Sequence, residues 1–204
     1  MKILIATPIH ELKDYSMRRW LKSVSEIKVD NSDEWKLLMV DNSQNPNYQE
    51  KVRGYCKELG FVNYNLLHIG GMIDSDEYTQ QRLGISREEI RQKLLNEDWD
   101  YWFSWECDII CPSNILTTLL KYSSDCDVVG HTYPLRRTRN DKGSYMELES
   151  MGLMLFPKRI FLNYGFTKGK IHRAGDGPLL NEIIAHWKWI SLHNCLTIEH
   201  LNDT

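Results

Sequence analysis

The sequence has no long hydrophobic run. Its apolar stretches are short and are broken by charged or polar residues, so none approaches the roughly 20 apolar residues that cross a membrane. The apolar start, residues 1–6, is closely followed by Pro8 and His10, too early for a signal peptide. We therefore expect no transmembrane segment and a cytoplasmic protein, either free or peripheral to a membrane.

Cysteine is scarce and shows no pairing pattern. The five cysteines, an odd number, include no Cys-x-x-Cys pair, which argues against both a disulfide framework and a zinc site. Cys107 and Cys111 fall in an apolar region. We expect them to be small core residues rather than ligands.

An excess of charge of either sign is also missing. The formal net charge is -3, from 25 Lys and Arg against 28 Asp and Glu. This balance gives no reason to expect nucleic acid as a partner. An anionic ligand would need a local cluster of cations or a metal ion.

The pattern along the chain alternates short apolar runs with segments of helical spacing. Strands are expected at residues 2–6, 36–40, 63–69, 100–105, 127–130, 151–156, 189–192 and 195–198. Helices are expected at residues 15–27, 48–59, 86–96 and 177–186, and after Pro112. This alternation predicts parallel βαβ units in one α/β domain over residues 1–204.

The segment before the third expected helix looks irregular. Residues 72–84 are polar and predict a surface excursion. Ser86 and Glu89 have the capping-box spacing of a helix start, so we expect Ser86 to be the N-cap.

Ligands of an open α/β sheet bind beyond the carboxyl ends of its strands. The most informative strand exit here is Trp105-Glu106-Cys107-Asp108-Ile109. In extended backbone, residues two apart point the same way, so Glu106 and Asp108 are expected to project together. A divalent cation with oxygen ligands, Mn²⁺ or Mg²⁺, would relieve their repulsion. The alternative is a pair of solvated acids at a strand end.

This exit also carries a family resemblance. Residues 100–112 resemble the Asp-x-Asp strand of GT-A glycosyltransferases, such as family 2 enzymes and the Mnn9/Anp1-type mannosyltransferases, with Glu106 in place of the first Asp. The resemblance implies a GT-A fold: a Rossmann-like, mostly parallel sheet flanked by helices, with a smaller mixed β region on the acceptor side. Residues 1–130 would bind the nucleotide sugar, and residues 131–204 would face the acceptor.

Further stretches match the family in order and imply roles. Thr7 and Pro8 resemble the loop that meets the nucleotide, Asp41 and Asn42 the second strand exit, and Arg87 a diphosphate contact. Glu106 would also contact the donor.

The resemblance implies a metal site and a base as well. The metal ligands would be Asp108, Glu106 and the late His200. Asp176 resembles the acidic motif that opens the acceptor-side helix, and it would act as the catalytic base. Its alternative role is a helix N-cap. A basic loop could close over the donor or be ordinary solvated surface; its residues are Arg136, Arg137, Arg139 and Lys142.

We therefore expect a metal-dependent glycosyltransferase. It would move a hexose from a nucleotide-sugar donor to a hydroxyl of a glycan, glycoprotein or glycolipid acceptor. One alternative is a sugar nucleotidyltransferase, although residues 7–11 lack the glycine and arginine usual after the first strand of such enzymes. The other is a non-catalytic nucleotide-sugar-binding protein, which the departures at Glu106 and Gly175 favour.

Overall fold

The computed structural model describes residues 1–70, 76–133, 151–166, 176–193 and 195–201, with only the backbone at 76–80 and 176–178. Its strands are β1 (Lys2–Ile9), β2 (Glu34–Asp41), β3 (Tyr64–His68), β4 (Tyr101–Trp105), β5 (Ile109–Ile110), β6 (Val128–His131), β7 (Leu153–Pro157), β8 (Trp189–Leu192) and β9 (Glu199–His200). Its helices are η1 (Glu11–Lys13), α1 (Asp14–Ser25), α2 (Tyr48–Glu58), α3 (Asp76–Asn96), α4 (Ile115–Leu120), η2 (Lys158–Leu162) and α5 (Asp176–His186).

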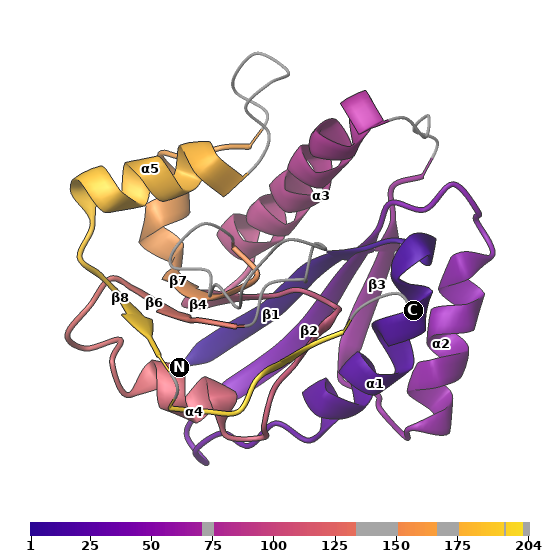
Figure 1. The fold of residues 1–204 in the computed structure, drawn as a ribbon, viewed down its shortest axis with the longest axis horizontal. Helices are drawn as coiled ribbons and strands as arrows, with labels where there is room; N and C mark the ends of the chain where they lie inside the picture. The colour runs from indigo at the N-terminus through magenta and orange to yellow at the C-terminus, as the bar shows by residue number, and fades with distance from the viewer. Residues whose placement is uncertain (71–75, 134–150, 167–175, 194, 202–204) are drawn as a thin grey trace, which may run out of the picture.

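One seven-stranded sheet runs through the molecule in the order β3-β2-β1-β4-β7-β6-β8. Every neighbouring pair is parallel except those of β7, which runs antiparallel to both β4 and β6. The expected mostly parallel α/β sheet is therefore confirmed. Because β7 lies between two strands of the first 131 residues, both parts of the chain build the same sheet (Figure 1).

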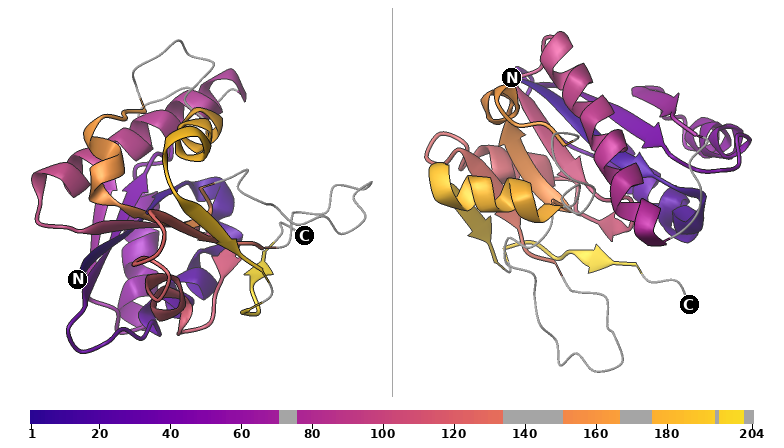
Figure 2. Two further views of the ribbon diagram at one scale, coloured as in Figure 1. Left: turned by 90° about the vertical axis from the view of Figure 1, so that its left-hand side faces the viewer. Right: turned by 90° about the horizontal axis from the view of Figure 1, so that it is seen from above.

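Helices cover both faces of this sheet (Figures 1 and 2). One face packs against α1, α2 and α4 through strand residues such as Ile5, Leu37 and Phe103. The other packs against α3, η2 and α5 through residues such as Ala6, Val40 and Trp102. Successive strand residues serve opposite faces, which is the two-residue period of a sheet buried on both sides.

The first helix, expected at residues 15–27 from its helical spacing, is confirmed as α1. Met17, Trp20, Leu21 and Val24 of α1 are fully buried against the sheet. Cys107 and Cys111 are buried in the same core, as expected.

The first strand is longer than predicted. β1 continues past Ala6 through Thr7 and Pro8 to Ile9, and it pairs with β2 up to Ile9 and Asp41. The carbonyls of Met1 and Ile9 accept hydrogen bonds from the amides of Glu34 and Asn42. The backbone N–H and C=O groups of the odd-numbered residues of β1 therefore point toward β2. Pro8 therefore faces the β4 side, where pairing has already ended at Ala6, and its missing N–H costs no ladder bond.

The surface excursion predicted at residues 72–84 is wrong for its described part, residues 76–84, and the Ser86 cap is wrong. α3 begins at Asp76, ten residues before Ser86. Ser86 lies inside the helix, buried, with its hydroxyl donating to the Arg82 carbonyl at 2.8 Å. A serine bonded to the carbonyl four residues earlier no longer serves as a cap.

The last predicted strand is also misplaced. Residues 195–198 are not a strand; the pairing residues are Glu199 and His200, which run antiparallel to β5. This small two-stranded sheet holds only two residues on each side, because β5 itself spans only Ile109 and Ile110. Among the residues the structure describes, no helix is both long and apolar enough to cross a membrane.

Candidate functional site

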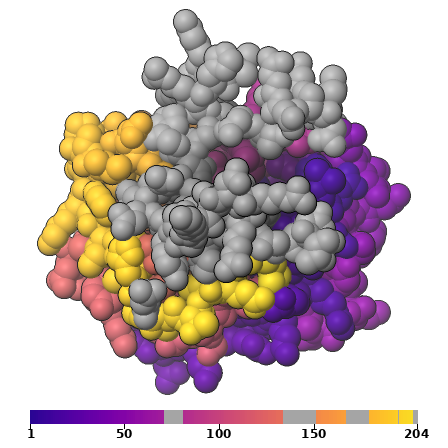
Figure 3. Space-filling model, in the orientation of Figure 1, coloured from indigo at the N-terminus to yellow at the C-terminus, as the bar shows by residue number. Residues whose placement is uncertain are grey.

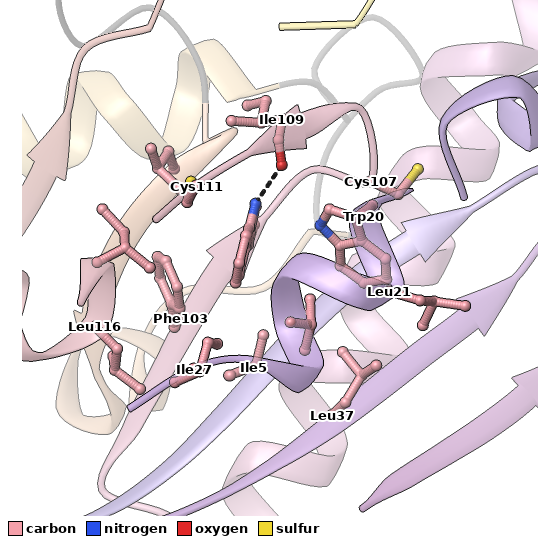
Figure 4. Close-up of a cluster of buried hydrophobic side chains, with 14 of the residues drawn as sticks. Ile5, Trp20, Leu21, Ile27, Leu37, Phe103, Cys107, Ile109, Cys111 and Leu116 are labelled. Carbon is pink, nitrogen blue, oxygen red and sulfur yellow. Dashed lines mark hydrogen bonds between the residues drawn. The ribbon is translucent and has the colours of Figure 1, made fainter. Parts of the chain in front are cut away.

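The chain makes a tight turn as it leaves β4, and this turn carries the predicted acidic pair. The Glu106 amide donates to the Gly152 carbonyl at 2.8 Å, and the Ile109 amide donates to the Glu106 carbonyl at 3.1 Å. The Trp105 indole N–H donates to the Ile109 carbonyl at 2.7 Å (Figure 4). Cys107 is buried in the core beneath, so the acidic turn, residues 106–108, is fixed from both sides.

The two carboxylates of the acidic turn meet one cation. Lys13 Nζ lies 3.1 Å from Asp108 Oδ2 and 3.9 Å from Glu106 Oε2. Asp108 is only 1% exposed, whereas the side chains of Glu106 and Lys13 are 29% and 33% exposed. The backbone here is a turn rather than extended, so the expected reason for their shared direction was wrong. Their common partner nevertheless places both acids on one side.

Charge on Lys13 is favoured by these neighbours. Burial works against the ammonium, but the negative charge of Glu106, together with that of Asp108, outweighs it. The pKa of Lys13 is therefore raised above its ordinary value. Within the described residues, the cation that faces both carboxylates is the chain's own Lys13.

His200 lies at the same carboxylate. His200 Nε2 is 3.5 Å from Asp108 Oδ2, and the Leu201 amide donates to the Asp108 carbonyl at 2.8 Å. The Tyr133 ring packs edge-on against the imidazole, with centroids 5.5 Å apart. The β9 segment thus lies beside the acidic turn, and Glu199 pairs with Arg19 of α1. Figure 3 shows the yellow C-terminal segment beside the indigo N-terminal part.

A second cluster lies at the exits of β2 and β3. Asp41, at the end of β2, is fully buried; its Oδ1 accepts from the Ser43 amide at 3.0 Å and its Oδ2 faces His68 Nδ1 at 2.9 Å. His68 is partly exposed. Its ring rests on Gly70, where an added Cβ would lie 2.0 Å from Nε2. Asp41 thus orients an imidazole at this edge.

Three residues that were predicted to contact the donor, Thr7, Asn42 and Arg87, are buried. Asn42 donates from Nδ2 to Ser86 Oγ at 2.9 Å, and Arg87 follows in α3 with its side chain buried. Because the Glu11 amide donates to Ser43 Oγ at 2.9 Å, the loop that bears Lys13 is tied to the exit of β2.

Other predicted residues fall outside the described side chains. Asp176 begins α5, but its side chain is not among those described. The basic loop with Arg136, Arg137, Arg139 and Lys142 lies wholly outside the described residues. Among the side chains that are described, no three of His, Cys, Asp and Glu are grouped so as to hold a metal ion by themselves.

The site contains residues that the sequence interpretation missed. Lys13 and His68 were not predicted to belong to the site, although Lys13 follows the first predicted strand and His68 lies near the end of the third. For Lys13 the available signal was a cation just past the first strand exit, in a fold whose ligands gather at such exits. For His68 it was a polar ring at the end of a strand next to Asp41.

Comparison with known proteins establishes the fold. Neither a protein-family model nor a curated protein sequence matches this chain. A crystal structure of Staphylococcus aureus TarS residues 1–349 with UDP-GlcNAc superposes with a TM-score of 0.67 at 10% identity, covering 100% of this chain and 60% of that one. The mannosyltransferase PcManGT of Pyrobaculum calidifontis, with GDP-Man and Mn²⁺, gives 0.60 at 12% identity, covering 95% and 55%.

A protein of STIV gives a TM-score of 0.54 at 13% identity, covering 100% of this chain and 87% of that one. The chain thus spans less than two thirds of the TarS and mannosyltransferase chains. At these identities the likeness concerns the fold alone: the chain has the GT-A fold. Nothing in the likeness points to the Mnn9/Anp1 type in particular.

Proposed function

We propose that this chain is a glycosyltransferase that moves a hexose from a nucleotide-sugar donor to a hydroxyl acceptor. The observation that carries the proposal is the cluster of Glu106, Asp108 and His200 at the carboxyl end of β4 in a GT-A fold. The structural neighbours TarS and PcManGT were solved with UDP-GlcNAc and with GDP-Man and Mn²⁺, which supports a nucleotide sugar as ligand.

The donor set fits a divalent cation. The acidic turn already holds a positive charge against two carboxylates. Mg²⁺ in such sites is commonly held by one or two carboxylates with substrate phosphates, so a three-ligand protein cage is not required. Asp108, Glu106 and His200 would hold Mn²⁺ or Mg²⁺ together with phosphate oxygens of the donor rather than by themselves, and the bound ion would neutralise charge on the diphosphate leaving group.

The remaining residues are assigned by position. We assign Asp41 to nucleotide recognition through His68, because both carboxylate oxygens of Asp41 already face protein groups. Thr7, Pro8, Asn42 and Arg87 would shape the donor side. Asp176 would be the base that accepts the hydroxyl proton, since a helix start favours its ionised form. The place of work would be the cytoplasm, free or beside a membrane-bound acceptor.

The test is release of nucleoside diphosphate from a panel of nucleotide sugars with Mn²⁺, with and without glycan acceptors. Asp108→Asn should lower the rate about a hundredfold or more, the scale for losing one charge-stabilising group. Asp98→Asn is the matched control, because Asp98 is an exposed carboxylate that pairs with Lys2. Binding of a nucleoside diphosphate without turnover of any donor would replace this proposal with a non-catalytic binding protein. Pyrophosphate formation from a nucleoside triphosphate and a sugar phosphate would replace it with a nucleotidyltransferase.

A further inference from the structure

Lys13 is held in place by its backbone rather than swinging freely at a loop tip. It ends η1, whose first turn is capped by His10 Nδ1 accepting from the Leu12 amide at 3.1 Å. The Lys13 carbonyl accepts from the Ser16 hydroxyl at 2.8 Å. The lysine side chain therefore starts from a fixed point when it reaches Asp108.

The same carboxylate oxygen serves both Lys13 and the proposed metal site. Lys13 Nζ is 3.1 Å from Asp108 Oδ2, whereas a divalent ion binds such an oxygen at roughly 2.0–2.6 Å. An ion there would lie within a few ångströms of the ammonium, and like charges at that separation repel strongly in a partly buried site. Metal and lysine therefore compete for the acidic turn.

We propose that Lys13 keeps free divalent ions off Glu106 and Asp108, so that metal enters only together with a nucleoside diphosphate. This inference rests on the metal and donor assignments of the proposed function. The diphosphate would supply the negative charge that lets both cations stay: the metal takes the carboxylates, and the displaced ammonium pairs with phosphate oxygens. Lys13 thus makes metal binding depend on nucleotide binding. Once both ligands are bound, Lys13 contacts the donor phosphates.

Mn²⁺ titration followed by electron paramagnetic resonance tests this, because it counts free ion and needs no turnover. The wild-type protein, Lys13→Met, Lys13→Gln and Lys13→Arg are titrated alone and with UDP or GDP. Lys2→Met is the control, because Lys2 also pairs with a carboxylate, Asp98 at 2.8 Å. Lys2 begins β1, at the end of the strand away from the proposed metal site. Circular dichroism checks that each variant is folded, and the Gln variant serves if the Met variant does not fold.

The expected result is a Mn²⁺ affinity without nucleotide that rises at least tenfold in Lys13→Met or Lys13→Gln. Lys13→Arg and Lys2→Met should match the wild type. The nucleoside diphosphate should raise Mn²⁺ affinity at least tenfold in the wild type and much less in the two neutral variants. Equal Mn²⁺ affinity in the wild type and the neutral variants, including no binding by either, overturns the inference.

The two proposals fail in different ways. Mn²⁺ binding coupled to nucleotide through Lys13, but with no sugar transfer from any donor, would remove the proposed activity and keep the role of Lys13. Sugar transfer with Mn²⁺, but with metal affinity unaffected by the neutral variants, would keep the activity and remove the role of Lys13.

Discussion

At the scale of single residues, Gly152 shows how closely the candidate site is packed. A Cβ at this position would lie 2.3 Å from the Tyr133 hydroxyl oxygen and 3.2 Å from Ile109 Cδ1. Tyr133 is buried and packs against His200, while the Gly152 carbonyl accepts from the Glu106 amide. One glycine therefore sets the position of both a site aromatic and the acidic turn.

Gly152→Ala should displace the Tyr133 ring and destabilise the protein by about 1–3 kcal/mol, the usual cost of overpacking a core. Gly54→Ala is the matched control, because a Cβ there meets nothing within 4 Å and Gly54 lies in α2. That change should stabilise the protein by about 0.5–1 kcal/mol. Urea unfolding measures both; equal effects of the two substitutions would contradict the packing described for Gly152.

At the scale of elements, Asp127 joins three segments just before β6 begins. Its side chain pairs with Arg159 of η2 and accepts from the Lys188 amide at 3.0 Å, next to β8. The hydrogen bond from Arg159 lowers the pKa of Asp127 below its ordinary value of 3.8. Since β8 is an edge strand, this carboxylate helps to fix the edge of the sheet.

Asp127→Asn should cost about 0.5–1 kcal/mol at neutral pH, a modest value because Arg159 is half exposed. The pKa is depressed in the folded protein, so the stabilisation is present above 3.8 and is lost as pH falls through the folded pKa. The unfolding free energies of wild type and variant should therefore converge in strong acid. A difference that stayed constant from pH 7 into strong acid would show that the charge of Asp127 plays no part.

Helix α3 shows where sequence patterns stopped being informative. Its second half was predicted because Ile90 and Leu94 are apolar at helical spacing, and both are buried. Its first half carries polar residues around Gly84, where no apolar period exists. Near the middle of the helix Arg82, Ser86 and Arg87 are buried, and Ser86 accepts a hydrogen bond from Asn42; no local pattern reveals such tertiary burial of polar residues.

At the scale of the whole molecule, the core is apolar on both sides of one sheet, and we expect this apolar burial to stabilise the fold without a metal. EDTA should therefore leave the melting temperature unchanged. A matching nucleoside diphosphate with Mn²⁺ should raise it, because a ligand at a hundred times its Kd stabilises the folded state by about 2.7 kcal/mol. Differential scanning fluorimetry measures both, with nucleoside diphosphate plus EDTA as control. A large fall in melting temperature with EDTA alone would mean that a metal is structural.

Much of the fold was predictable, and less of the site. The positions of the large-sheet strands between residues 2 and 157 follow from apolar runs and turn residues, and the parallel sheet follows from their alternation with helices; the two-residue β5 was not predicted. Asp108 was predictable because an acid at a strand exit stands out. Lys13 offered only a weak signal, a cation past the first strand exit, and its role depends on the carboxylates that folding brings to it. The placement of β7 between β4 and β6 is likewise a tertiary fact.

The acidic turn is anchored by parts that lie far apart in the sequence, Lys13 near one end and His200 and Leu201 near the other. On the ribosome, a growing chain can align β1 with β2, β3 and β4 before residues 199–201 have been synthesised. Its acidic turn then lacks the contacts that His200 and Leu201 make with Asp108. The arrangement of Glu106, Asp108 and Lys13 seen in the folded protein is therefore complete only after residues 199–201 have been synthesised.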